Sequence, residues 1–359
     1  MELTPETTLK EILQYTAAQK ATDLHLSAGM PAVIRADEGL TPITSQAITQ
    51  EQMVKYIREY LSQERFDEFQ AKRELDYSFG IPGMGRYRAN LYYSQGQIAC
   101  AIRSLPVEPP TFDQIGFPLD VAQRLLSKPS GLILVTGPTG SGKTTTLAAM
   151  IDHINTNEPY HIITIEDPVE VSFKNKKSIV HQREVGTDTL TFAQGLKYAL
   201  RQDPDVILIG EMRDLETISI ALTVAETGHL VFATLHTPDC VQAINRIIDV
   251  FPAHQQQQVK AQLSFVLQGV ICQQLMPKVG GGLVMAPEIL IANPAIRALI
   301  RDSKIHQIYS SIEMGQKEGM RTLNFSLVQL IRAGKITREV AQSRTPDIVE
   351  FERIFQQTK

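Results

Sequence analysis

Hydrophobic and polar residues alternate over short stretches in the first hundred residues of the chain. The alternating segments are Asp23 to Ser27, Ala32 to Ala36, Leu75 to Phe79, Arg86 to Tyr93 and Ile98 to Arg103. This period of two predicts half-buried β-strands. Helical patterns precede and interrupt the strands, from about Pro5 to Gln19 and from about Gln50 to Ala71. The N-terminal part is therefore predicted to be an α+β domain.

Continuous apolar runs replace this alternation after residue 130. They are Leu132 to Thr136, His161 to Ile165, Val206 to Gly210 and Leu230 to Leu235. Such runs, separated by helical patterns like Thr145 to Ile154, are typical of buried parallel strands with helices on both faces of the sheet. Beyond Pro252 the pattern predicts helices. The second part is therefore predicted to be α/β, with a mostly parallel sheet and a helical C-terminal part.

A proline-rich segment, Pro106-Val107-Glu108-Pro109-Pro110, separates the two patterns. Clustered prolines are typical of an interdomain linker, because each fixes the backbone and removes an N–H donor. We therefore expect an N-terminal domain over residues 1–105, a linker over 106–116 and a C-terminal domain over 117–359. A second cluster, Gly280 to Gly282, lies within the predicted helical region.

Composition narrows the class of protein. A chain of 359 residues with 43% hydrophobic content supports two globular domains. The net charge of −4 gives no basic footprint, so nucleic acid is not expected as a partner. Three widely spaced cysteines offer neither a disulfide framework nor a cysteine-rich zinc site. The polar N-terminus does not resemble a signal peptide, and no apolar run approaches the ~20 residues of a membrane span. A cytoplasmic protein is expected.

The candidate chemistry begins with the run Gly137-Pro138-Thr139-Gly140-Ser141-Gly142-Lys143-Thr144, which fills every position of the G-x-x-x-x-G-K-[ST] phosphate-binding loop. It lies between a predicted strand and a predicted helix that continues with Thr145. Backbone N–H groups and the helix N-terminus are expected to hold a nucleoside triphosphate there. Lys143 supplies positive charge, and the Thr144 hydroxyl ligates Mg²⁺. The alternative is a glycine-rich turn that binds nothing.

Polar residues follow the predicted strands, at the sheet edge where open parallel sheets bind ligands. Glu166, Asp167 and Glu170 follow the second apolar run, and Glu211 follows the third. Glu211 takes the place of the aspartate that commonly closes a Walker B strand, so it is predicted to reach Mg²⁺ or its water. Either Glu166 or Glu170 is predicted to orient the attacking water. The alternative for each is ordinary loop solvation.

Two histidines, His229 and His236, flank the fourth apolar run. Their odd spacing of seven places the side chains on opposite faces of a regular strand, so they cannot chelate one metal and zinc is not expected. Two interpretations stay open for each: a satisfied core or loop histidine, or a role in sensing the γ-phosphate or in a subunit contact.

The N-terminal domain contains a candidate anion site. If Gln95-Gly96 forms a two-residue hairpin turn, Arg88 lies directly opposite Arg103, with Arg86 on the same face. Facing like charges are unfavourable unless an anion lies between them. The pair is therefore predicted to act as arginine fingers on a neighbouring subunit's triphosphate. A solvated arginine face with a different turn register is the alternative.

Seven segments together resemble the secretion-type ATPase superfamily, and within it the retraction ATPases of type IV pili. They are ATDLHLSAG (21–29), RYRANLY (86–92), GPTGSGKTTT (137–146), ITIEDPVE (163–170), RQDPDVILIGEMRD (201–214), AETGHLVFATLHT (225–237) and PAIRALIRDSK (294–304). The resemblance implies a PAS-like N-terminal domain and a RecA-like P-loop NTPase domain. It also implies a homohexameric ring that hydrolyses ATP, with Mg²⁺, between domains of adjacent subunits.

The resemblance also implies roles for single residues. Glu170 matches the catalytic glutamate of the Asp box, Glu211 the Walker B glutamate, and His229 and His236 the His-box histidines. Arg88 and Arg103 fall where family members contact the triphosphate.

The C-terminal motif departs from the usual AIRNLIRE of the family. Ala298 replaces asparagine and Asp302 replaces glutamate, while Arg297 and Arg301 still match. Any role that depends on the asparagine amide is therefore in doubt for this chain.

The function that the resemblance implies is a motor for pilus retraction in twitching motility. The motor would dock on the inner-membrane platform protein of the pilus machine, with a paralogous retraction ATPase as a further possible partner. The first alternative is the accessory paralogue itself. A pilus-assembly or type II secretion ATPase and a RecA-like nucleic-acid translocase are weaker alternatives.

Overall fold

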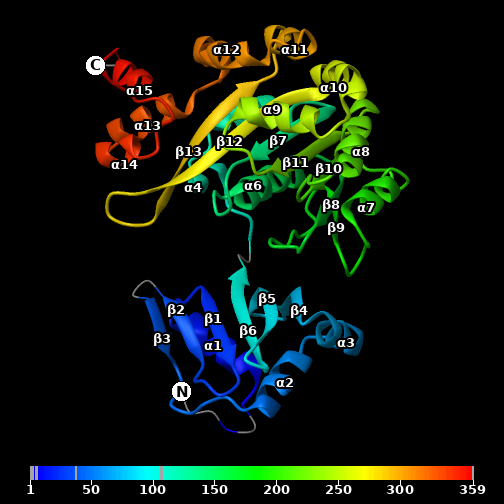
Figure 1. The fold of residues 1–359 in the computed structure, drawn as a ribbon, viewed down its shortest axis with the longest axis vertical. Helices are drawn as coiled ribbons and strands as arrows, with labels where there is room; N and C mark the ends of the chain where they lie inside the picture. Colours follow the sequence, from blue (N-terminus) through cyan, green and yellow to red (C-terminus); the bar gives the residue numbers. More distant parts are fainter. Residues whose placement is uncertain (1–3, 5–6, 37–38, 106–107, 358–359) are drawn as a thin grey trace. The chain divides into compact units, whose positions relative to one another are not determined.

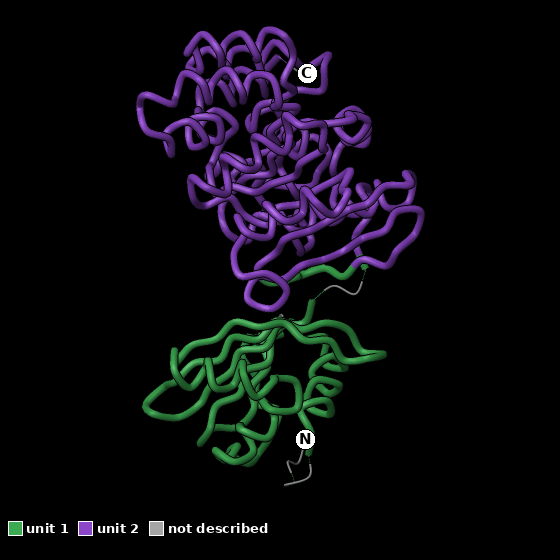
Figure 2. Tube along the Cα trace, turned by 90° about the vertical axis from the view of Figure 1, so that its right-hand side faces the viewer, with its two compact units in different colours: residues 1–108, 168–172 green, residues 109–167, 173–359 purple. Residues whose placement is uncertain are grey.

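The computed structural model describes residues 4, 7–36, 39–105 and 108–357. The chain forms two compact units (Figure 2). Unit 1 contains Met1–Glu108 and Pro168–Ser172, and unit 2 contains Pro109–Asp167 and Phe173–Lys359. Pro5, at the start of the first predicted helix, and Pro106 and Val107 of the predicted linker lie outside the described residues. The domain boundaries inferred from the sequence stay predictions.

Unit 1 is an antiparallel sheet packed against helices (Figure 1). The strands follow the order β3-β2-β1-β6-β5-β4 across the sheet. Their bounds are β1 (Asp23–Ser27), β2 (Val33–Ala36), β3 (Gly39–Pro42), β4 (Glu74–Ile81), β5 (Gly85–Ser94) and β6 (Gln97–Leu105). The helices are α1 (Leu9–Ala18), α2 (Gln50–Arg58) and α3 (Gln63–Lys72).

Local sequence explains the elements of unit 1. Thr8 and Thr49 begin α1 and α2 with capping boxes, in which the threonine and a residue three positions later satisfy each other's backbone N–H. Burial alternates along β4 and β5, so one face of the sheet packs into an apolar core and the other face is polar. The polar face carries Arg88 and Arg103.

Unit 2 is built on a mixed sheet with the order β13-β12-β7-β11-β10-β8-β9. The strands are β7 (Gly131–Thr136), β8 (His161–Glu166), β9 (Ile179–Glu184), β10 (Val206–Ile209), β11 (Leu230–Leu235), β12 (Leu267–Pro277) and β13 (Leu283–Ile291). The helices are α4 (Phe112–Ile115), α5 (Leu119–Leu126), α6 (Lys143–Asn157), α7 (Phe192–Ala199), α8 (Leu215–Glu226), α9 (Cys240–Asp249), α10 (Ala253–Val266), α11 (Pro294–Arg301), α12 (Ile308–Met314), α13 (Leu323–Arg332), α14 (Arg338–Gln342) and α15 (Ile348–Gln357).

The central strands of unit 2 are covered on both faces. Every residue of β7, β10 and β11 is buried, and these strands run parallel to one another. Strands covered on both sides need no alternation, which explains their continuous apolar runs. The last helices, orange to red in Figure 1, end the chain, and α13 and α14 pack on the β12–β13 hairpin around a separate apolar cluster that includes Met276 and Phe351.

The predicted fold class is confirmed, with three corrections. The region beyond Pro252 is not only helical, because β12 and β13 follow α10 and the glycine cluster 280–282 lies in the turn that joins them. Strands β3 and β9 were not predicted. Both lie at sheet edges and carry few buried residues, so neither has an apolar pattern.

Among the described helices, none is long and apolar enough to cross a bilayer.

Candidate nucleotide-binding site

The phosphate-binding loop connects the end of β7 to the start of α6. Gly137, Gly140 and Gly142 adopt φ values of 140°, 77° and 86°, which favour glycine. At Gly137 a Cβ would also lie 2.4 Å from the Gln273 carbonyl oxygen, so no side chain fits there. The loop therefore has the tight strand-to-helix turn that the sequence motif predicts.

The N-terminus of α6 is suited to an anion. The helix has fifteen residues, and its N-cap, Gly142, makes no side-chain capping bond. Thr144 and Thr145 lie in the first turn, where backbone N–H groups have no acceptor four residues earlier in the helix. Lys143 Nζ donates to the carbonyl oxygens of Gly137 and Pro138 at 2.9 and 3.1 Å. The loop thus brings a cation and a helix N-terminus together, which fits a nucleotide phosphate.

Polar residues meet the phosphate-binding loop at the same edge of the sheet. The strand order β7-β11-β10-β8, with all four strands parallel, places Gly137, His236, Glu211 and Glu166 at or just beyond the carboxyl ends of neighbouring strands. The Gly210 backbone donates to the Ile165 carbonyl oxygen at 2.8 Å, which fixes the backbone just before Glu211. The structure therefore assembles most of the predicted constellation within unit 2.

Glu211 lies at the centre of a small charged cluster. Its Oε2 is 2.7 Å from Arg213 Nη2, and its Oε1 is 3.4 Å from His236 Nε2. Burial by itself would raise the pKa of Glu211, but the hydrogen bond and charge of Arg213, helped by His236, hold it below its ordinary value. Glu211 is therefore a carboxylate at neutral pH. Arg213 was not singled out from the sequence, although it lies only two residues beyond Glu211.

The two candidate glutamates of the Asp box have different surroundings. Glu166 is buried, and its Oε1 accepts hydrogen bonds from Thr164 Oγ1 at 2.6 Å and Gln182 Nε2 at 3.1 Å. Glu170 is half-exposed and belongs to the segment that groups with unit 1, where its Oε1 lies 3.3 Å from Arg88 Nη1. Neighbouring side chains thus hold Glu166 in place, whereas Glu170 remains accessible to solvent.

His229 does not join the other predicted residues. It precedes β11, at the end of the strand opposite to His236 and the phosphate-binding loop. Its Nδ1 lies 3.1 Å from the Val224 carbonyl oxygen and 3.2 Å from Thr227 Oγ1, so the ring is anchored at the C-terminus of α8. Within one chain the geometry favours a satisfied loop histidine, and a subunit contact stays a prediction.

The arginine pair in unit 1 has the predicted register. Gln95 and Gly96 both have positive φ, at 51° and 78°, and Arg88 pairs with Arg103 across β5 and β6. Arg103 Nε lies 2.7 Å from Asp23 Oδ1 on β1. Arg86, on the same face, donates from Nη2 to Ser78 Oγ at 2.8 Å. Carboxylates therefore neutralise part of the charge of the pair.

The two arginines of the C-terminal motif have separate roles in the fold. Arg297 donates from Nε to the Ala292 carbonyl oxygen at 3.0 Å and from Nη1 to the Ser264 carbonyl oxygen at 2.7 Å, and it also contacts the Phe265 carbonyl oxygen. These contacts cap the C-terminus of α10. Arg301 is exposed and lies 3.5 Å from Asp302 Oδ1. Arg297 is therefore held by the backbone of α10, whereas Arg301 is exposed.

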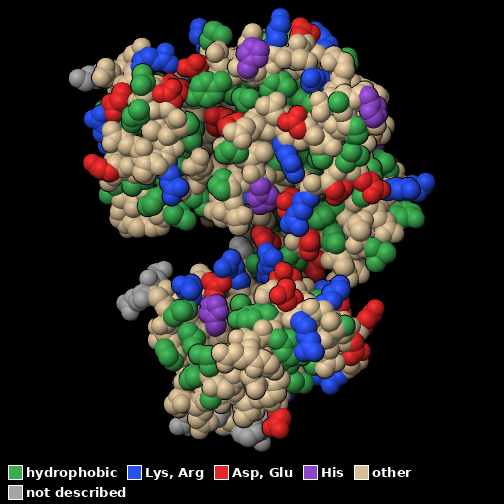
Figure 3. All heavy atoms as spheres, viewed as in Figure 1, with side chains coloured by type: hydrophobic (Ala, Val, Ile, Leu, Met, Phe, Trp, Pro, Cys, Tyr) green, Lys and Arg blue, Asp and Glu red, His purple; other side chains and the backbone are tan. Residues whose placement is uncertain are grey.

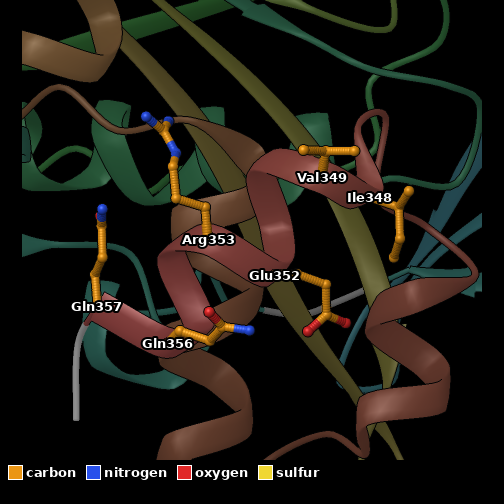
Figure 4. A pocket seen from close by; sticks show the side chains of 6 residues that line it. All are labelled: Ile348, Val349, Glu352, Arg353, Gln356 and Gln357. Carbon is orange, nitrogen blue, oxygen red and sulfur yellow. The ribbon is translucent and has the colours of Figure 1, made fainter.

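A pocket lies on the surface at α15. A hollow of about 480 Å³ is lined by Ile348, Val349, Glu352, Arg353, Gln356 and Gln357 of α15 (Figure 4). None of these residues belongs to a nucleotide motif.

On the face of the molecule in Figure 3, basic and acidic side chains are interspersed, and no continuous basic stripe crosses that face.

The family profile described as "Type II/IV secretion system protein" matches residues 101–338. The type IV pilus retraction ATPase PilT of Pseudomonas aeruginosa is 47% identical over 94% of this chain and 97% of its own length. The chain belongs to the type II/IV secretion system protein family. With the complete phosphate-binding loop, this membership makes it an ATPase.

Two further comparisons, with PilT and with PilU, show which members of the family this chain resembles over most of its length. A crystal structure of the pilus retraction motor PilT with bound ADP is 49% identical, with a TM-score of 0.90, and the match covers 97% of this chain and 100% of that chain. The type IV pilus ATPase PilU of P. aeruginosa is 35% identical over 92% of this chain and 87% of its own length. The similarity to PilT thus includes unit 1 as well as the ATPase unit.

Proposed function

We propose that this ATPase powers the retraction of a type IV pilus, which is the activity in the name of its relative PilT. The observation that carries the proposal is the identity of 47% over nearly the full length of both chains, including the unit that carries the arginine pair. The accessory ATPase PilU is less similar, at 35%. An accessory role remains the second candidate, because that relative also aligns over most of this chain.

Within this proposal, the phosphate-binding loop holds ATP. The backbone N–H groups at the start of α6 and the ammonium of Lys143 bind the phosphates, and Thr144 and Glu211 face the Mg²⁺ side. Mg²⁺ neutralises phosphate charge when it is bound. The low pKa of Glu211 supports this assignment, because an ionised carboxylate is what a divalent cation and its waters require.

Glu170 is the residue that we propose to orient the attacking water. A general base needs a lone pair free to accept a proton from water. Glu166 is buried and accepts hydrogen bonds from two neighbours, whereas Glu170 is half-exposed and contacts one arginine. The surroundings therefore favour Glu170 for the reaction and Glu166 for holding the sheet edge in place.

We further propose that the protein works as a homohexameric ring in the cytoplasm, docked on the platform protein at the inner membrane. Arg88 and Arg103 of one subunit would contact the triphosphate of the next, in place of the carboxylates that they now contact. Rotation about the proline-rich linker would convert this contact and its release into displacement of the platform.

Deletion of the gene in the source cell tests the proposal. A retraction motor predicts cells with excess surface pili and no twitching, because assembly continues while retraction stops. An accessory paralogue predicts pili that still retract, and a pilus-assembly ATPase predicts cells without pili. Either of these last two outcomes would contradict the retraction proposal.

A further inference from the structure

One glutamine from a distant strand holds the phosphate-binding loop. Strand β12 lies beside β7, and Cys272 pairs with Thr136, the last residue of β7. The next residue, Gln273, therefore lies level with the start of the loop, and the residue is 1% exposed. Its Nε2 donates a hydrogen bond of 2.7 Å to the Ser141 carbonyl oxygen, 132 residues away in the sequence.

Gln273 also contacts both ends of the loop. Its backbone oxygen would lie 2.4 Å from a Cβ at Gly137, and its Nε2 would lie 3.2 Å from a Cβ at Gly142. The first approach excludes any side chain at Gly137, and Gly142 has the positive φ that begins α6. Gln273 therefore packs against two of the motif's glycines, and its backbone alone requires a glycine at Gly137.

The hydrogen bond fixes the orientation of one peptide plane. In a planar trans peptide, the carbonyl oxygen of one residue and the N–H of the next point in opposite directions. Because the Ser141 carbonyl oxygen points at Gln273, the Gly142 N–H points away from Gln273. In the phosphate-binding motif this N–H belongs to the set that surrounds the β-phosphate.

We propose that Gln273 is a positioning residue for the phosphate-binding loop, and that it holds the Ser141–Gly142 peptide with its N–H toward the phosphate. The inference rests on the proposed binding of ATP by this loop. It adds a residue that lies outside every nucleotide motif in the sequence and acts through the loop without touching the nucleotide.

Buried polar atoms argue against a packing role for this side chain. Gln273 Oε1 and Ser141 Oγ are both buried, and neither has a hydrogen-bond partner among the described residues. An unpaired buried polar atom costs free energy, so an apolar side chain of similar size would serve better if the position only filled space. A glutamine at this site is explained if its amide N–H is needed to hold the Ser141 carbonyl oxygen.

The test measures ADP affinity, in the presence of Mg²⁺, for wild type and for Gln273→Glu at pH 8.5 and pH 6. Glutamate has the shape of glutamine, but it has no donor when ionised and regains one when protonated, and burial raises the pKa of such a carboxyl. We expect the variant to bind ADP roughly tenfold more weakly than wild type at pH 8.5. The ratio of the two affinities should approach one at pH 6.

Two further variants separate positioning from folding. Gln273→Met keeps the volume without a donor, so it should bind ADP roughly tenfold more weakly at both pH values. Gln274 lies on the same strand with its side chain toward the other face. The Gln274→Glu variant should therefore bind ADP like wild type. If Gln273→Glu does not fold, the ADP affinity of Gln273→Met relative to wild type decides.

The possible results are distinct. Wild-type affinity of the Gln273→Glu variant at both pH values, or wild-type affinity in a folded Gln273→Met variant, would overturn the positioning role and leave ATP binding intact. Failure of the wild-type protein itself to bind ADP would contradict the proposed function, and this inference with it.

Discussion

Arg88 and Arg103 lie directly opposite each other on the adjacent strands β5 and β6. Each contacts a carboxylate, with 3.3 Å between Arg88 Nη1 and Glu170 Oε1 and 2.7 Å between Arg103 Nε and Asp23 Oδ1. Two facing guanidiniums repel each other unless anions lie nearby. The carboxylates meet that need in the isolated chain, and a triphosphate carries more negative charge in a geometry that arginine binds well.

The first prediction concerns rings assembled from two inactive variants. Lys143→Ala lacks the phosphate-binding cation, and Arg88→Ala/Arg103→Ala lacks the arginine pair. If the arginines act on the neighbouring subunit, mixed rings contain some interfaces with an intact loop and intact arginines. Partial ATPase activity should therefore return on mixing, as measured by phosphate release.

Rings of wild type doped with each variant are the control for this experiment. Absence of recovery in confirmed mixed hexamers has two explanations, which are arginines that act within their own subunit and a ring that tolerates no inactive neighbour. If wild-type rings keep activity in proportion to their active subunits, the second explanation is excluded and the trans assignment is wrong.

The second prediction separates the three acidic residues at the sheet edge. Glu170→Gln should bind ADP normally but lose roughly 10²-fold or more in turnover, because the attacking water loses the base that we propose. Glu211→Gln should lose turnover and also require more Mg²⁺, if Glu211 faces the metal side as we propose. Glu166→Gln keeps neutral hydrogen bonds with its neighbours and should retain most of the activity. If Glu166→Gln traps ATP while Glu170→Gln turns over normally, the choice of base is wrong.

The third prediction concerns the C-terminal motif. Arg297→Ala removes several hydrogen bonds at the end of α10, so it should lower the free energy of unfolding by about 1–2 kcal/mol. Arg301→Ala removes an exposed side chain and should change stability by less than about 0.5 kcal/mol.

Arg301→Ala is therefore the cleaner probe of coupling to the pilus. Its ATPase activity should be close to wild type, while twitching should be impaired if the exposed arginine contacts the machine. Wild-type twitching of this variant would support a purely structural motif.

The fourth prediction follows from the pKa of Glu211, which is lower in the folded protein than the ordinary value of 4.5. A lowered pKa means that ionised Glu211 stabilises the fold at pH values above 4.5, and that this contribution disappears as the pH falls through the folded pKa. The difference in unfolding free energy between wild type and Glu211→Gln should thus shrink as the pH falls from about 4.5 through the folded pKa of Glu211. Denaturant titrations at each pH measure it, and a difference that grows toward acid would contradict the assignment.

Local patterns predicted the parts of the site that depend on nearby residues. The phosphate-binding loop needs only eight consecutive residues, and the two-residue turn at Gln95-Gly96 fixes the pairing of Arg88 with Arg103. Parallel strands bring their carboxyl ends to one edge, and the structure places Glu211 beside His236 at that edge.

The missed parts depend on long-range contacts. Strand β12 was not predicted, since Gln273 and Gln274 interrupt its apolar run, yet Gln273 is buried because it bonds to the loop. No local signal marks a contact over 132 residues. His229 and His236 flank β11 as the sequence predicted, so they lie at opposite ends of that strand. Two residues that adjoin the same strand lie at the same edge of the sheet only when both are at the same end of that strand.

The most direct test of the whole account is observation of labelled pili in cells that lack the gene and carry either wild type or Lys143→Ala. Retraction powered by ATP bound at this loop predicts that wild type restores retraction events and that Lys143→Ala produces an equal amount of folded protein without restoring them. Normal retraction with Lys143→Ala would contradict the account, because hydrolysis at this loop would then not be the source of the movement.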